Sequence, residues 1–214
     1  ILRWDRDTVK SIKDHEAILS NFASRKANIL VGTQMIAKGL HLPNVTLVGV
    51  ILADIGLNSA DLRASERTFQ VLTQVAGRAG RGESVGHVVI QTYNPEHYAI
   101  RSAAKQNYKE FYDKEIQFRR SLSYPPYSGQ IRLTLNLQNP TVATREAQRM
   151  GNALKSELRS WDIRDLRIIG PAPSSQSPIR GSSSWSINIL GLNPHMLLEK
   201  INLPHSWKVD VDPY

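Results

Sequence analysis

A glutamine and two arginines stand at a spacing that would place them on one side of a helix. Gln74, Arg78 and Arg81 stand at positions i, i+4 and i+7, which share one helix face. A guanidinium is always charged and binds phosphate oxygens as a fork. Two of them on one face suit a triphosphate, whose charge grows during hydrolysis. The alternative is a solvated, charged helix end, which the helix macrodipole favours.

Two glycines interrupt this arginine stretch, and apolar residues fill its other side. A glycine costs roughly 1 kcal/mol relative to alanine inside a helix, so Gly77 and Gly80 indicate that backbone or a ligand comes very close there. Phe69, Leu72 and Val75 lie largely off the polar face and can pack inward. We therefore predict a helix that continues through the second arginine, with one buried side and one side facing a cleft.

A second candidate site lies at Gly32–Gly39, after a predicted strand. It is not a phosphate loop of the Gly-Lys-Ser/Thr kind, because Lys38 precedes its glycine. A glycine at a strand end and Thr33 can offer backbone donors and a hydroxyl to a DNA phosphate, and Lys38 can pair with another. The alternative is an ordinary glycine-bounded turn between a strand and a helix.

The composition favours a polyanionic partner such as nucleic acid. The 214 residues carry 27 basic and 19 acidic side chains, a net charge of +8 that is spread along the chain. The absence of cysteine excludes a disulfide framework, a zinc ribbon and a cysteine nucleophile, and agrees with a reducing cytoplasm. No apolar run is long enough to span a bilayer and no signal peptide is visible. Because the first residue is Ile1, we expect a fragment of a longer chain.

No metal site is expected. Asp5 and Asp7 share a strand face, and so do Asp210 and Asp212. Neither pair has a histidine or further acids nearby in sequence, and Mg²⁺ or Ca²⁺ demands more ligands than two. The histidines show no His-Glu-x-x-His spacing.

The first part of the chain alternates strands with helices, which predicts a parallel, doubly wound sheet. Three Asn-Pro pairs mark further helix starts, since Asn caps well and Pro fits the first helical position. We place a domain boundary at residue 122, because Tyr124-Pro125-Pro126-Tyr127 must end the preceding helix. Strands are expected at 1–4, 27–31, 45–53 and 87–92, and helices at 8–23, 33–38, 65–81 and 95–122.

The second part has a different order, β-α-β-β-α-β, which is the ferredoxin-like pattern. This topology names no function by itself. Its expected strands are 131–137, 166–169, 185–190 and 207–211, its helices start at Asn139-Pro140 and Asn193-Pro194, and residues 170–184 are expected to form a loop.

The pattern Gln-x-x-Gly-Arg-x-Gly-Arg resembles the sixth motif of superfamily 2 helicases, and Gly32–Gly39 looks like their motif V. The resemblance narrows to the PriA family of bacterial replication-restart helicases (primosomal protein N′) and covers nearly the whole chain. The further runs that carry it are Ala53-Asp54, Asp61–Arg67, Gln91-Thr92-Tyr93, Tyr124–Tyr127, Gly170–Pro173 and Val209–Pro213.

This resemblance implies that residues 1–122 form a second RecA-like helicase lobe and residues 123–214 a C-terminal ferredoxin-like domain. It implies catalytic roles for Gln74, Arg78 and Arg81, nucleotide contacts at Gly77, Gly80, Gly32 and Gly39, and DNA contacts at Thr33, Gln34, Lys38 and Arg63. Asp54 and Asp61 match the family pattern without a clear role.

The resemblance also implies an ATP-dependent DNA helicase with 3′→5′ polarity. ATP and Mg²⁺ are expected on a first lobe that this sequence lacks, and the family's zinc has no ligands here. This chain alone is therefore expected to be inactive. The implied partners are forked and single-stranded DNA, single-strand-binding protein and primosome proteins. We expect a monomer in the bacterial cytoplasm, associated with the nucleoid.

Some features leave alternatives open. Arg145, Arg149 and Arg159 could bind DNA or the acidic tail of single-strand-binding protein, a partner of the family, or simply form a solvated face. Ser182–Trp185 stands where the family shows further arginines and aromatics, which weakens an expectation of phosphate contacts there. The main rival function is a non-enzymatic adaptor for nucleic acid or protein, which would not need the arginine motif. A phosphotransferase would need a complete phosphate loop, and none is present.

Overall fold

The computed structural model describes residues 1–5, 8–33, 45–59, 61–80, 85–161, 165–174 and 182–213. The chain forms two compact units, unit 1 (Ile1–Glu115) and unit 2 (Ile116–Tyr214). They divide inside helix α5 (Tyr108–Ser121), whereas the sequence-predicted boundary falls just after that helix. Each unit has its own buried apolar cluster.

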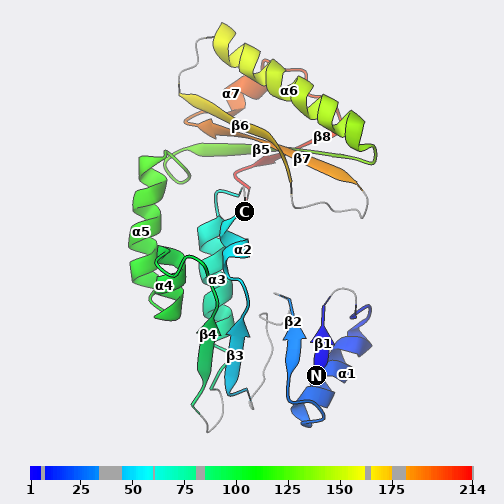
Figure 1. Ribbon diagram of the computed structural model, residues 1–214. Coiled ribbons are helices and arrows are strands. Elements are labelled where there is room, and N and C mark those ends of the chain that lie inside the picture. Colours follow the sequence, from blue (N-terminus) through cyan, green and yellow to red (C-terminus); the bar gives the residue numbers. More distant parts are fainter. Residues whose placement is uncertain are drawn as a thin grey trace. The chain divides into compact units, whose positions relative to one another are not determined.

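Unit 1 begins with a parallel pair of short strands, β1 (Leu2–Trp4) and β2 (Leu30–Gly32), joined through α1 (Ile12–Ala23) (Figure 1). The helix begins later than predicted. Ser11, not Thr8, is its N-cap, and its hydroxyl accepts from a backbone N–H one turn along in a capping box. Parallel pairing with a helix between the strands is the arrangement that the sequence pattern predicts for this region.

A second parallel pair follows, made by β3 (Leu47–Val50) and β4 (His87–Ile90). Between them lie α2 (Asp54–Leu57) and α3 (Ala64–Ala76). The buried cluster of unit 1 consists of Ala53, Phe69, Leu72, Ala99, Ile100, Ala103 and Phe111. The ring of Phe69 stacks on that of Phe111 with centroids 4.2 Å apart. This packing fixes the rotation of α3 and hence the place where its last turn emerges.

The long helix predicted from residue 95 to 122 is wrong, because two helices occupy this stretch. They are α4 (Tyr98–Ala104) and α5, and Gln106 between them has a φ of 51°. Asn107 starts the second helix, since its Oδ1 accepts the backbone N–H of Glu110 at 3.0 Å.

The predicted asparagine caps hold for only one of the three helices, although α7 (His195–Leu198) begins within one residue of its predicted start. Asn139 caps α6 (Pro140–Ser160) by accepting two backbone N–H groups. In contrast, α4 is capped by His97, whose Nδ1 accepts from Ala99 N at 3.2 Å. The last helix, α7, has no side-chain cap. Burial lowers the pKa of His97, which favours the neutral ring that an accepting Nδ1 requires.

Unit 2 contains a four-stranded sheet in the order β6-β7-β5-β8, with all neighbours antiparallel (Figure 1). The chain runs β-α-β-β-α-β, as the sequence pattern predicts. The remaining bounds are β5 (Gly129–Leu137), β6 (Leu166–Pro173), β7 (Ser183–Gly191) and β8 (Trp207–Val211). The loop predicted over 170–184 is wrong at both ends, because β6 continues to Pro173 and β7 begins at Ser183.

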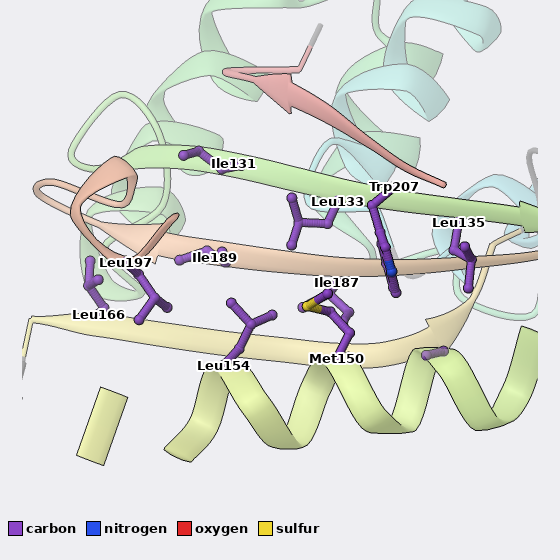
Figure 2. Packing of buried hydrophobic residues seen from close by; sticks show 11 residues of the cluster. Ile131, Leu133, Leu135, Met150, Leu154, Leu166, Ile187, Ile189, Leu197 and Trp207 are labelled. Atoms are coloured by element: carbon purple, nitrogen blue, oxygen red, sulfur yellow. The ribbon is translucent and has the colours of Figure 1, made fainter. Parts of the chain in front are cut away.

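The core of unit 2 lies between this sheet and α6 (Figure 2). Met150 and Leu154 point from the helix toward Leu133 and Ile187 of the two central strands, and none of the four is more than 1% exposed. Burying such a side chain contributes about 1.5–3 kcal/mol. Alternation along β5 places Ile131, Leu133 and Leu135 in this core, which confirms the pattern read from the sequence.

Candidate nucleotide and DNA site

The arginine stretch leaves the helix earlier than predicted. Helix α3 ends at Ala76, and Gly77 is its C-cap, with its N–H donating to Thr73 O at 3.0 Å. The N–H of Arg78 donates to Val75 O, also at 3.0 Å, so Arg78 lies in a turn after the helix. The prediction of one continuous helix through both arginines is therefore wrong.

This changes how the three predicted catalytic residues are related. Gln74 remains on the helix and is exposed, whereas Arg78 is half-buried in the turn. Arg81 lies outside the described residues. A shared helix face therefore does not align Gln74 with Arg78. The turn, rather than the spacing of a helix, sets the direction of the first arginine.

Backbone contacts hold this turn, residues 77–80, against the start of both strands of the β3–β4 pair. Gly80 has a φ of 72°, which favours glycine, and its N–H donates to Val45 O at 3.0 Å. Gly86 packs so closely on it that a Cβ there would lie 2.2 Å from Gly80 N and 2.4 Å from Ala79 C. Val45 precedes β3 and Gly86 precedes β4. We call this arrangement the arginine-turn clamp.

The two predicted nucleotide-contact glycines of this stretch differ. Gly80 is explained by its own backbone conformation and by the clamp. Gly77 has a φ of −67°, and a Cβ there would meet nothing closer than Thr73 O at 3.5 Å. Alanine would fit at position 77, so close backbone approach does not explain this glycine.

The start of α3 is a network of charges that neutralise one another. Asp61 Oδ1 accepts the backbone N–H of Arg63 at 3.0 Å, and its other oxygen pairs with Arg67 at 2.7 Å. Arg63 donates to both carboxylate oxygens of Glu66, at 2.9 and 3.3 Å. Carboxylates also favour a helix N-terminus. Arg63, the predicted DNA contact, would have to exchange Glu66 for a phosphate in order to bind DNA.

The predicted motif V set can be placed only in part. Gly32 ends β2 and Thr33 follows it, and both are exposed at the carboxyl end of a parallel strand. Ligands bind beyond such strand ends in open α/β sheets. Gln34, Lys38 and Gly39 lie outside the described residues.

Asp54 has a structural contact that the sequence did not indicate. It starts α2 beyond β3, accepts the hydroxyl of Thr92 at 2.9 Å and accepts the backbone N–H of Tyr93 at 3.0 Å. These bonds, above all the one from Tyr93 N, lower the pKa of the carboxyl group. Asp54 thereby ties together the segments that leave the carboxyl ends of β3 and β4.

The predicted partner-binding residues lie on α6 in unit 2. Arg145 is exposed, whereas Arg149 is paired with Glu146, at 2.7 Å for the closest contact. This hydrogen-bonded pairing lowers the pKa of Glu146, which also accepts from Trp207 Nε1 at 3.3 Å. Of the two arginines, Arg149 is therefore already engaged within the protein.

Within the described ranges, no group of three or more acidic or histidine side chains could hold a metal ion. Among the same residues, no helix has both the length and the apolar character needed to cross a bilayer.

Comparison with known proteins places these features in a family. Residues 7–83 match the helicase conserved C-terminal domain. The replication restart protein PriA of Bacillus subtilis (strain 168) is 46% identical over 180 residues, covering 84% of this chain and 22% of the relative. The Synechocystis protein of that name is 42% identical over 186 residues, covering 87% and 22%. The Chlamydia pneumoniae protein is 37% identical over 221 residues, covering 99% and 29%.

These relatives are much longer than the chain, which spans less than a third of the length of each. Several of them nevertheless align with most of it, through both units. The matched helicase domain, residues 7–83, includes the arginine motif and the motif V pattern. The chain belongs to the PriA family of replication restart proteins, to whose C-terminal portion it corresponds.

Proposed function

We propose that this chain supplies one half of the motor of an ATP-dependent 3′→5′ DNA helicase that acts in replication restart. In this proposal Arg78 stabilises the charge that develops on ATP during hydrolysis, and Gln74 and Arg81 belong to the same site. The arginine-turn clamp carries the proposal. A charge-stabilising group works best when its position is fixed before the reaction begins.

ATP supplies the phosphoanhydride bond whose hydrolysis drives the motor, and a first lobe holds it together with Mg²⁺. The chain's own part is to present a fixed guanidinium from outside that lobe. The 214-residue chain is therefore expected to be inactive alone. The zinc of the intact family has no cysteine ligands in this sequence.

The assignment of the two parts is also a proposal. Residues 1–122 are proposed as a second RecA-like lobe, which the parallel pairing of β1 with β2 and of β3 with β4 supports. Residues 123–214 are proposed as a ferredoxin-like domain, supported by the order β6-β7-β5-β8 of its antiparallel sheet.

The proposed partners follow from the family. They are forked and single-stranded DNA, primosome proteins and single-strand-binding protein, all in the bacterial cytoplasm. Thr33, Gln34, Lys38 and Arg63 are proposed to contact DNA, and Gly32, Gly39, Gly77 and Gly80 to lie near the nucleotide. Arg145 and Arg149 are proposed to receive the acidic tail of single-strand-binding protein. We propose that the protein acts as a monomer.

The decisive experiment replaces Arg78 in the longer protein that joins this chain to a first lobe. Arg78→Ala should lower the kcat of DNA-stimulated ATP hydrolysis by about 10³-fold or more, as for an arginine finger. Arg78→Lys keeps a charge without the fork and should recover only part of this loss. DNA binding, measured by fluorescence anisotropy, should be retained in both variants.

The matched control is Arg101→Ala, which removes an exposed arginine of α4 that pairs with Glu96 at 3.0 Å. It should leave kcat unchanged. If Arg78→Ala also leaves kcat unchanged, the motor proposal is wrong. The rival, a non-enzymatic adaptor, predicts that result, because an adaptor has no use for a clamped arginine.

A further inference from the structure

Unit 2 holds a second group of arginines where α5 leads into β5. The chain leaves α5, passes through the Tyr-Pro-Pro-Tyr segment and enters the sheet, and one residue of β6 lies beside this path. We define the arginine–tyrosine cluster as Phe118, Arg120, Tyr124, Tyr127 and Arg167. All five residues belong to unit 2, so the geometry of the cluster does not depend on unit 1.

Each guanidinium of the cluster lies over a tyrosine ring. Arg120 Cζ is 5.1 Å from the centroid of the Tyr127 ring, and Arg167 Cζ is 5.7 Å from that of Tyr124. Arg167 also donates to the backbone carbonyl of Ser123 at 3.3 Å. Stacking restrains a guanidinium and still leaves N–H groups at its edge available to an anion. Restraint before binding reduces the entropy that is lost on binding.

The positive charge of the cluster is not balanced by acids. Arg120 and Arg167 are both exposed. Among the residues that the structure describes, neither guanidinium lies within ion-pairing distance of a carboxylate. Arg63 differs, since Glu66 occupies its fork. The two cluster arginines therefore keep their charge for an external anion, with which charge-assisted hydrogen bonds are strong.

An exposed aromatic ring completes the cluster. Phe118 is 47% exposed and meets the Tyr124 ring edge-on, with centroids 6.3 Å apart. A nucleic-acid base stacks on such a ring when its face is free, and base pairing in a duplex keeps that face covered. Cations and an exposed ring together fit a ligand that carries both phosphates and unpaired bases.

We propose that the arginine–tyrosine cluster binds single-stranded nucleic acid, with its guanidiniums on phosphates and Phe118 against a base. A simple anion would account for the cations and leave the ring without a role. An apolar partner would account for the ring and leave two charges uncompensated. The inference rests on the proposed function only in taking nucleic acid as the ligand. It needs neither ATP nor the arginine turn.

The test uses the 214-residue chain without nucleotide and a fluorescein-labelled oligothymidylate, followed by anisotropy over a range of salt concentrations. Arg120→Gln, and separately Arg167→Gln, should weaken binding and reduce the slope of log K against log salt by about 0.7 for each phosphate that is no longer neutralised. Phe118→Leu should weaken binding by roughly 5- to 150-fold, the size of one base–aromatic stack, with the slope unchanged.

Two matched controls separate this site from general charge and from misfolding. Arg101→Gln removes one positive charge from unit 1 and should change neither affinity nor slope. An abasic oligonucleotide of the same length should bind the wild type and the Phe118→Leu variant equally. Unfolding midpoints of all variants identify any that are destabilised.

The proposal is overturned if the wild type does not bind the oligonucleotide, or if it binds duplex or abasic DNA as tightly. It is also overturned if Arg120→Gln, Arg167→Gln and Phe118→Leu all bind like the wild type. None of these results bears on ATP hydrolysis by the longer protein. Conversely, a reduced kcat in Arg78→Ala would leave the cluster untouched, so the two proposals fail separately.

Discussion

The two edges of the β3–β4 pair are held by different physical means. At the amino edge, backbone contacts hold the arginine turn, through the bond from Gly80 N to Val45 O and the close approach of Gly86. At the carboxyl edge, one carboxylate, that of Asp54, accepts donors from Thr92 and Tyr93. The backbone hydrogen bond and the close approach of Gly86 involve no titrating group, whereas the carboxylate contact depends on an ionised one.

The contacts at the amino edge determine the position of the arginine turn, whereas those at the carboxyl edge contribute mainly to stability. Adding a Cβ to a closely packed glycine forces the neighbouring backbone to move, so a contact of this kind is lost in one step. A carboxylate with two donors weakens by degrees as it is protonated or replaced. We therefore expect substitutions at the amino edge to affect catalysis and those at the carboxyl edge to affect stability.

Among substitutions that leave the arginine itself in place, the largest effect is expected from Gly86→Ala in the longer protein. The added Cβ would stand 2.2 Å from Gly80 N, so the arginine turn must shift. A shift of about 1 Å at a catalytic group can cost on the order of 100-fold in rate, and overpacking costs about 1–3 kcal/mol of stability. Steady-state ATPase assays and urea unfolding measure the two effects. A kcat like that of the wild type in a folded variant would show that the clamp does not position Arg78.

A smaller effect, on stability, is expected from Asp54→Asn. Because the folded-state pKa of Asp54 lies below its ordinary value of 3.8, the unfolded chain takes up the proton first as pH falls. The ionised carboxylate therefore stabilises the fold above that ordinary value, and this contribution disappears as pH falls through the lowered pKa.

The measurement is the urea midpoint of wild type and Asp54→Asn across this range of pH. The variant should unfold at lower urea near neutral pH, and the two curves should converge in acid. The kcat of the longer protein should change little, since the substitution lies at the opposite edge from Arg78. Curves that stay parallel down to acid pH would exclude the ionised carboxylate as the cause.

Local signals in the sequence predicted local structure well. Asn139 followed by proline predicted the start of α6, and it caps that helix because a short polar side chain reaches its own next turn. Alternation along β5 likewise predicted its buried face, because this pattern repeats within one strand. The arginine motif also indicated the family to which the chain belongs.

Structure that depends on distant partners was not predictable. The clamp joins Gly80 to Val45 and Gly86, which only the folded strand pair brings together. Glycine and proline at 170–173 suggested a loop, yet this segment pairs with β7, with an irregularity between Ile169 and Ala172. The break at Gln106 carries no glycine or proline signal. At the clamp and at 170–173, tertiary pairing overrode local propensity, whereas α4 ends before Gln106 through local bonds from Gln106 N to Ala103 O and from Asn107 N to Ser102 O.

The smallest effect is expected from Gly77→Ala, which tests the remaining glycine of the arginine stretch. Its φ of −67° suits alanine, and a Cβ would make only ordinary contact with Thr73 O at 3.5 Å. Alanine restricts the unfolded chain, so the variant should be about 0.4–1 kcal/mol more stable, with kcat and the KM for ATP unchanged. Urea unfolding and ATPase assays check both. A raised KM with normal stability would instead mean that a nucleotide approaches the backbone at Gly77. The region in which backbone position affects catalysis would then extend from the clamp back to the end of α3.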